Sequence, residues 1–382
     1  MADNVEHVIS YWVLYQKFHS PALGGFAVIS HWVPHLFFAA FSGTLADRFD
    51  VRRLIQIGML LLMGVSLSWG WMFYTDSVQM WKAMLLLIAH GMAGVIWLPA
   101  SQVLIHQIVR PQELPSAVRL NATGRYMGFL IGPAVGAALL LGFGPIHGIW
   151  INSLICAPML IWLIRAPYGA AVLDWKPPPR ALRGLADVRD SLRAVAQNPI
   201  LLSMTALIGA SSFFVGNAYQ AQMPGFAHSL GNARADFSYS LLLAADAAGG
   251  LFAGIVLESR SLLPPRVRTA FYLAMIWSVL LAGFALAGSY WLAIVLLFLA
   301  GFVELAFNAM AQTLVQLNAP ADKRGSIIGV FTMSSLGLRA FSGLSVGVLG
   351  ESIGIHHSLA FSAGLLFLIY FALLVYRRVR GD

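Results

Sequence analysis

Long, unbroken apolar segments recur along the chain and limit its fold more than any other sequence feature. A helix needs roughly 20 apolar residues to cross about 30 Å of hydrocarbon. The eleven segments of suitable length are 22–43, 52–73, 81–105, 117–141, 146–166, 199–222, 238–257, 269–288, 290–311, 326–348 and 357–376, and a shorter apolar piece runs from Val8 to Phe18. They lack the alternation of β-barrel strands. The sequence therefore predicts an all-α membrane protein.

The basic residues are distributed unevenly between the two sides that these spans define. The net charge is +8, which by itself is compatible with nucleic-acid binding. Nineteen of the 24 Lys and Arg residues, however, fall on one side, and only Lys17, Lys82 and Arg234 fall on the other. This is the positive-inside asymmetry. It predicts that the central loop and the C-terminus are cytoplasmic, and it leaves no basic patch for a nucleic acid.

The apolar runs stop once, in the middle of the chain. We expect an N-terminal bundle over 1–166, a linker over 167–198 and a C-terminal bundle over 199–382. Pro177, Pro178 and Pro179 interrupt any helix in the linker. From Arg180 to Gln197, apolar and charged residues alternate at helical spacing, which suits either an interfacial amphipathic helix or a solvated tether.

A charged motif lies between the second and third apolar segments and has a weaker copy 211 positions later. Gly43 precedes Asp47 by four residues, with Arg48, Arg52 and Arg53 following; Gly254 precedes Glu258 by the same spacing. The first copy resembles the loop between the second and third helices of major facilitator superfamily (MFS) transporters. The resemblance implies two six-helix bundles with twelve spans, related by a pseudo-two-fold axis along the membrane normal, and substrate bound between them.

The resemblance also gives the motif a role, as a latch on the cytoplasmic side. Asp47 is expected to cap the N-terminus of the third helix, where the helix dipole favours an anion. The arginines are expected to reach carboxylates or lipid phosphates; the alternative is that they only fix the topology. Asp50 and Val51 depart from the Gly-Arg pair of the wider superfamily.

A second motif lies in the fifth helix. Gly128, Gly132, Pro133 and Gly136 form a Gly-x-x-x-Gly-Pro-x-x-Gly pattern. It resembles the fifth helix of enterobactin exporters, also called the transmembrane secretion effector group, with Ala137 where exporters often have another glycine. Small residues permit close helix approach, so the pattern indicates either an exporter-type seam or ordinary small-residue packing.

Polar residues inside the spans are the candidate cavity and proton-coupling groups, because a charge at mid-bilayer costs roughly 2.5–3.5 kcal/mol. They are Asp3 and Glu6 on the first helix, His90 on the fourth, Asn217 and Gln220 on the seventh, Asp246 on the eighth, Glu304 on the tenth and Arg339 on the eleventh. The pairs Asp3/Asn217, Glu6/Gln220 and His90/Glu304 share an offset of 214 residues, which suggests equivalent depths in the two halves.

Glu304 is the leading candidate for proton coupling, with a structural pair to Arg339 as the alternative. Asp246 either joins a relay or supports packing, and His90 is expected to be a packed hydrogen-bond partner. His31 and His35 are four residues apart on the second helix, but no further ligand accompanies them in the sequence, so no metal site is expected. The sequence contains no recognisable nucleophile, metal or phosphate-loop motif, so we expect neither an enzyme nor a cofactor.

These observations predict a proton-coupled exporter of a small amphiphilic molecule, such as a siderophore, drug or metabolite, acting as a monomer in a bacterial inner membrane. An uptake symporter and a non-transporting scaffold or sensor are the alternatives. Gly43 has only 42 residues before it, and the second span takes about 20 of them. Counting back from the turn at His19 places Glu6 near mid-membrane. We therefore expect either a start roughly ten to twenty residues upstream of Met1 or a short first helix with Asp3 and Glu6 at the cytoplasmic surface.

Overall fold

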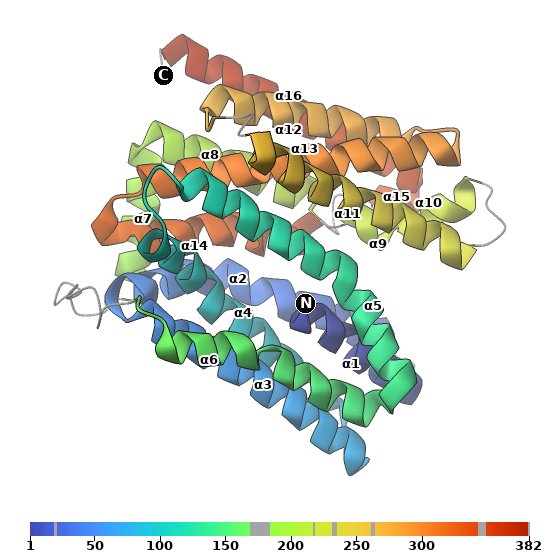
Figure 1. Cartoon of the computed structure of the whole chain (residues 1–382). Coiled ribbons are helices and arrows are strands. Elements are labelled where there is room, and N and C mark those ends of the chain that lie inside the picture. Colours follow the sequence, from blue (N-terminus) through green and yellow to red (C-terminus); the bar gives the residue numbers. More distant parts are fainter. Residues whose placement is uncertain are drawn as a thin grey trace. The chain divides into compact units, whose positions relative to one another are not determined.

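The computed structural model describes residues 1–18, 21–168, 184–216, 218–230, 235–260, 264–342 and 349–380. All regular elements in these ranges are helices, and the ranges contain no strand (Figure 1). The helices are α1 Ala2–Phe18, α2 Pro21–Arg48, α3 Val51–Tyr74, α4 Met80–Ile108, α5 Leu114–Ile155, α6 Ala157–Arg165, α7 Leu185–Gln197, α8 Pro199–Phe214, α9 Ala218–Ala221, α10 Met223–Ser229, α11 Ala235–Arg260, α12 Val267–Ala285, α13 Tyr290–Asn318, η1 Ala321–Lys323, α14 Arg324–Ser335, η2 Gly337–Phe341, α15 Leu349–Ile353 and α16 Ile355–Arg380.

The break between the fifth and sixth expected spans lies inside α5. Gly144 has φ 72° and ψ 173°, and it separates two helical segments of α5. Only glycine adopts such a conformation without strain, and Pro145 follows directly. The sixth expected span therefore consists of the end of α5 followed by α6.

The surface of the protein is that of a membrane protein. Seven helices within the described ranges are long and apolar enough to cross a bilayer. Large apolar side chains are widely exposed, among them Leu141 at 86%, Trp291 at 72% and Leu368 at 61%. Soluble monomeric proteins rarely expose this much apolar surface to water. The prediction of an all-α membrane protein is confirmed, and the count of twelve spans stays a prediction.

The chain divides into two compact units. Unit 1 comprises Met1–Arg110, Met127–Ser191 and Pro320–Met333; unit 2 comprises Pro111–Tyr126, Leu192–Ala319 and Ser334–Asp382. In unit 1, α2 and α3 pack against α4, and Val5, Trp69 and Ile149 belong to the buried core. In unit 2, α11 and α12 pack against α13, and α12 also packs against α16.

The linker contains a helix where the sequence allowed either a helix or a tether. α7 covers Leu185–Gln197, with Ser191 and Val195 buried. The helical alternative is therefore correct for this part of the linker. Residues 169–183, including the three prolines, lie outside the described residues, and the domain boundaries 166/167 and 198/199 stay predictions.

Candidate functional site

The motif at Gly43 lies where α2 crosses the start of α14, inside unit 1. A β-carbon at Gly43 would meet the carbonyl oxygen of Gly325 and would lie 2.8 Å from the Cα of Gly329. Only glycine therefore permits this approach of two backbones. The second copy is similar: within unit 2, a β-carbon at Gly254 of α11 would lie 2.8 Å from the Cβ of Thr123 on α5. Both copies thus mark a close helix crossing.

Asp47 caps a helix N-terminus, but not the one that the sequence suggested. Its Oδ1 accepts a hydrogen bond from the backbone N–H of Gly325, and its Oδ2 accepts one from the N–H of Ser326 at 2.7 Å. These are amides of the first turn of α14, which have no partner within their own helix. The expectation that Asp47 caps α3 is wrong: Asp50 does so, accepting from the N–H of Arg52 at 3.0 Å.

The physical reason is that the glycine crossing carries the end of α2 onto the N-terminus of α14, a helix distant in sequence. Any helix N-terminus attracts a carboxylate. The sequence therefore predicted that Asp47 caps a helix, but not that this helix is α14. Burial raises the pKa of Asp47 to about 6, and the two backbone N–H donors partly oppose this shift. Burial also lowers the pKa of the Arg324 guanidinium, an effect that Asp47 partly opposes.

The three arginines of the motif differ in their surroundings. Arg48 forms an ion pair with Asp187 of α7 at 2.7 Å, and both side chains are only 12% exposed. Arg52 donates to the carbonyl of Ala166 at 2.9 Å and contacts Asp50 at 3.2 Å. Arg53 is exposed. Arg48 therefore joins the end of α2 to the linker helix, so a role beyond fixing the topology is supported for it.

Within unit 1, α1 packs against the glycine stripe of α5, which consists of Gly128, Gly132 and Gly136. A β-carbon at Gly132 would lie 2.7 Å from the Cβ of Asn4, and one at Gly136 would lie 3.0 Å from the Cβ of Val8. At Gly128 it would lie 3.0 Å from the N-terminal nitrogen of Met1, and the Asn4 amide donates to the Gly128 carbonyl at 3.2 Å. The stripe therefore makes a tight helix seam, as its small residues predict. Pro133 lies inside the same helix.

A first polar network connects α1 to α4. His90 lies between two carboxylates: its Nε2 is 2.5 Å from Asp3 Oδ1, and its Nδ1 is 2.7 Å from Glu6 Oε1. Ser66 of α3 donates to Glu6 Oε2, and Asn152 of α5 donates to Ser66 at 3.3 Å. Asp3, Glu6 and His90 were each candidates from the sequence, and the fold brings all three together. His90 is a buried hydrogen-bond partner, as expected.

A second polar network lies in unit 2. The Tyr219 hydroxyl of α9 is 3.0 Å from Asp246 Oδ2 of α11 and 3.3 Å from Glu304 Oε2 of α13. The Gln220 amide donates to Asp246 Oδ2 at 2.9 Å. Within the described part of the chain, Asp246 Oδ1 is buried and has no hydrogen-bond partner. Arg339 of η2 donates from Nε to the carbonyl of Ser335 at 3.1 Å.

Asn217 lies outside the described residues, so its predicted role stays a prediction. The network shows one residue that the sequence did not reveal, Tyr219. The 214-residue offset from Glu6 indicated Gln220, the chain neighbour of Tyr219. The signal that would have identified Tyr219 is an aromatic hydroxyl next to an amide side chain inside a membrane helix.

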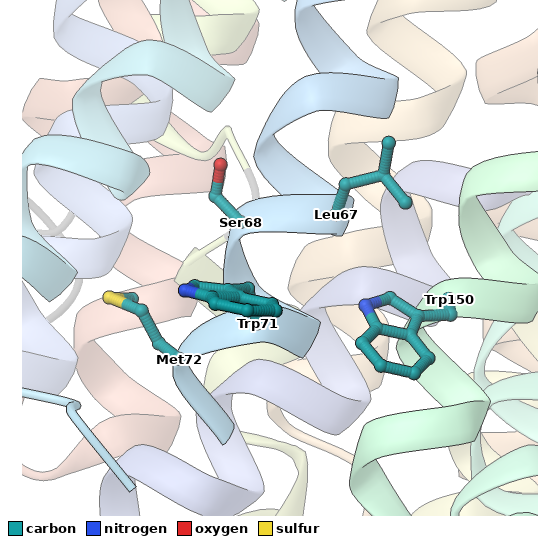
Figure 2. A pocket seen from close by; sticks show the side chains of 5 residues that line it. All are labelled: Leu67, Ser68, Trp71, Met72 and Trp150. Carbon is teal, nitrogen blue, oxygen red and sulfur yellow. The ribbon is translucent and has the colours of Figure 1, made fainter. Parts of the chain in front are cut away.

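A groove on the α3 surface shares no lining residue with either network. It encloses about 450 Å³ and is lined by Leu67, Ser68, Trp71, Met72 and Trp150 (Figure 2). Figure 2 shows the indoles of Trp71, from α3, and Trp150, from α5, with Ser68 as the one hydroxyl among the labelled side chains. Trp71 is 61% exposed near the end of α3. Tryptophan in such a place is typical of a membrane interface, and the groove offers no charged group to a substrate.

Ionisable side chains within apolar membrane helices commonly mark substrate or ion pathways, and both polar networks contain such side chains. A sequence model of the Major Facilitator Superfamily matches residues 7–343. The chain belongs to this superfamily. It is therefore an MFS membrane transporter, and the resemblance inferred from the motifs is confirmed at that level.

This MFS transporter is similar along most of its length to known members. It is 25% identical over 360 residues to the uncharacterized MFS-type transporter YfiS of Bacillus subtilis (strain 168), covering 91% of this chain and 82% of YfiS. The human organic anion transporter MFSD10 has the same fold, with TM-score 0.80, 14% identity and coverage of 98% and 97%. The E. coli fucose:proton symporter FucP has TM-score 0.69, 14% identity and coverage of 98% and 96%.

Proposed function

We propose that this MFS transporter is a proton-coupled exporter of a small amphiphilic molecule, such as a siderophore, drug or metabolite. It acts in a bacterial inner membrane with its central loop and C-terminus in the cytoplasm. Protons exchange at Asp246 and Glu304, and the substrate moves by alternating access. No further cofactor is required, because the ion gradient supplies the energy.

The observation that supports proton coupling is that two carboxylates converge on one hydroxyl. Tyr219 has a single O–H proton, and both Asp246 and Glu304 lie within hydrogen-bond range of it. Two ionised carboxylates that share one donor repel each other, and one added proton relieves this repulsion. Asp246 Oδ1, which is buried and has no hydrogen-bond partner among the described residues, is a place for that proton. The pair therefore has a physical reason to exchange a proton during the cycle.

Unit 2 contains other ionisable groups besides this pair. Tyr370 of α16 is fully buried, and its hydroxyl donates to the carbonyl of Leu207 at 3.2 Å. Arg339 lies on η2, which packs against α8. Substitution experiments on the carboxylates should therefore include Tyr370→Phe, which removes this hydroxyl and keeps the ring.

The α5 seam is the observation that supports export. Gly128, Gly132 and Gly136 hold α1 against α5, in the arrangement expected of exporter-type fifth helices. Uptake by symport is the second candidate function, because the fucose:proton symporter shares the fold.

A growth screen of a deletion strain against siderophores, drugs and dyes identifies a substrate for transport assays. Purified protein in liposomes should accumulate that substrate when a pH gradient is imposed. Glu304→Gln should abolish gradient-driven accumulation while folding, judged by thermal unfolding, stays intact. Glu113→Gln, which neutralises an exposed loop carboxylate, is the matched control and should transport normally.

Reversing the imposed gradient distinguishes export from uptake, because only the antiporter moves substrate against the proton flux. Proton coupling through Glu304 is ruled out if Glu304→Gln is fully active or if movement ignores the gradient. The absence of any growth phenotype across a broad panel, with normal membrane expression, would count against export.

A further inference from the structure

Four side chains from three helices of unit 1 converge on one point. They are Asp3 and His7 of α1, His31 of α2 and His90 of α4, and one potential ligand atom of each lies within 4.8 Å of all the others. We propose that these four residues bind a divalent transition-metal ion of the zinc class. The sequence linked His31 only with His35, whereas the fold supplies three other partners.

The spacing of the four groups suits a tetrahedral ion. In a tetrahedral site, zinc–nitrogen and zinc–oxygen bonds of about 2.0–2.2 Å place neighbouring ligand atoms about 3.3–3.6 Å apart. Here Asp3 Oδ1 lies 2.5 Å from His90 Nε2 and 4.0 Å from His7 Nε2. The His7 ring centroid is 4.9 Å from those of both His31 and His90, and the latter two are 5.5 Å apart. Shifts of about 1 Å would therefore create the required geometry.

The second nitrogen of His90 is already oriented by a carboxylate. Its Nδ1 lies 2.7 Å from Glu6 Oε1, which leaves Nε2 to face Asp3 and the centre of the cluster. Histidine ligands of metals usually donate their other N–H to a carboxylate, which fixes the ring and raises its basicity. Ser66 in turn donates to Glu6 Oε2. The outer interactions that a metal-binding histidine needs are therefore in place.

Charge and ligand chemistry select the kind of ion. Asp3 and Glu6 can together contribute two negative charges, which one divalent cation balances in a low-dielectric environment. Imidazole ligands suit zinc, copper, iron and nickel, whereas magnesium and calcium prefer all-oxygen sites. Three histidines and one aspartate therefore favour a transition metal.

The cluster is buried on one side and open on the other. The His90 side chain is 4% exposed, whereas those of His7 and Asp3 are 22% and 38% exposed. An ion can therefore enter past Asp3 and His7 and bind against His90. The site does not depend on the proposed export, since the carboxylate pair of Asp246 and Glu304 lies in unit 2.

The test is zinc binding to the full-length protein in lipid nanodiscs, with any histidine tag removed. Calorimetry together with elemental analysis should show one tightly bound Zn²⁺ per chain, and excess Mg²⁺ should not displace it. Glu6→Gln should weaken binding about 10- to 100-fold, and His31→Ala should weaken it at least as much. His147→Ala, which removes an exposed histidine of the same unit, is the matched control and should bind as the wild type does.

A spectroscopic measurement keeps the test independent of how well the variants fold. X-ray absorption of the zinc-loaded wild-type protein should show imidazole and carboxylate ligands in four-coordination. Thermal unfolding of each variant without added metal checks that lost binding is not lost structure. The proposal is overturned if the wild-type protein binds no stoichiometric Zn²⁺, if the spectrum lacks imidazole, or if folded His31→Ala binds like His147→Ala.

Discussion

Replacing Gly43 by alanine tests whether the α2–α14 crossing depends on backbone contact. The new β-carbon would lie 2.8 Å from Gly329 Cα and 2.9 Å from the Gly325 carbonyl carbon. Non-bonded carbons normally lie about 3.5–4.0 Å apart. Both neighbours are backbone atoms and cannot rotate away, so α2 and α14 must separate by about 1 Å.

The expected loss has two parts. Forcing an extra methyl group into a packed interface costs about 1–3 kcal/mol. A separation of about 1 Å also stretches the Ser326 N–H···Asp47 hydrogen bond, 2.7 Å in the structure, beyond the normal range of about 2.7–3.2 Å. An unsatisfied buried N–H costs a further 1–3 kcal/mol, roughly. Even the two lower values add to a loss of about 2 kcal/mol. This loss raises the equilibrium constant for opening of the α2–α14 crossing roughly 30-fold.

Hydrogen–deuterium exchange measures this opening directly, because the capped amides belong to Gly325 and Ser326. In Gly43→Ala, exchange in a peptide covering residues 324–329 should be faster by about 30-fold or more. Gly64→Ala on α3 is the control, since within the described chain no atom from outside the local helix backbone lies within 4 Å of the β-carbon it adds. Equal exchange in the two variants would show that the crossing tolerates a side chain and would refute the reasoning.

Two further predictions concern the same motif. Burial raises the pKa of Asp47 in the folded protein to about 6, against 3.8 for the free side chain. The folded state therefore binds this proton more tightly than the unfolded state does. The resulting stability is fully present below about pH 4 and is lost as pH rises through 6. The unfolding free energy of the wild type relative to Asp47→Asn should therefore fall by up to about 3 kcal/mol from pH 4 to 7, and a flat difference would contradict this. A double-mutant cycle with Arg48→Ala and Asp187→Ala should give a coupling of about 1–2 kcal/mol, above the 0.2–1 kcal/mol of exposed pairs, because both side chains are largely buried. Thermal unfolding in detergent measures it, and a coupling below about 0.2 kcal/mol would show that α7 is not anchored by this pair.

The helices themselves were largely predictable from the sequence. Apolar length located α2, α3, α4, α12, α13 and α16, and the amphipathic pattern before Gln197 located α7. The turn at Gly144 and Pro145 fell in the gap between two expected spans. These features are local: hydrocarbon thickness sets helix length, and glycine or proline sets the breaks.

The site was predictable in its residue types but only partly in its contacts. Asp3, Glu6 and His90 were singled out because polar groups in apolar helices are costly, and they do meet. Asp47 was expected to bind the nearest helix N-terminus along the chain, but it binds α14 instead. No spacing along the chain indicated that His7 and His90 would lie beside His31.

Composition, segment length and one local motif were enough to predict an all-helical membrane protein that resembles MFS transporters. Which helix Asp47 caps, which side chains surround His90 and where Tyr219 contacts two carboxylates became known only from the folded chain. Such contacts depend on which helix faces approach each other, and at Gly43 that approach is set by a missing side chain that permits backbone contact with residues about 280 positions away. Residue spacing along one helix cannot encode the partner across the crossing.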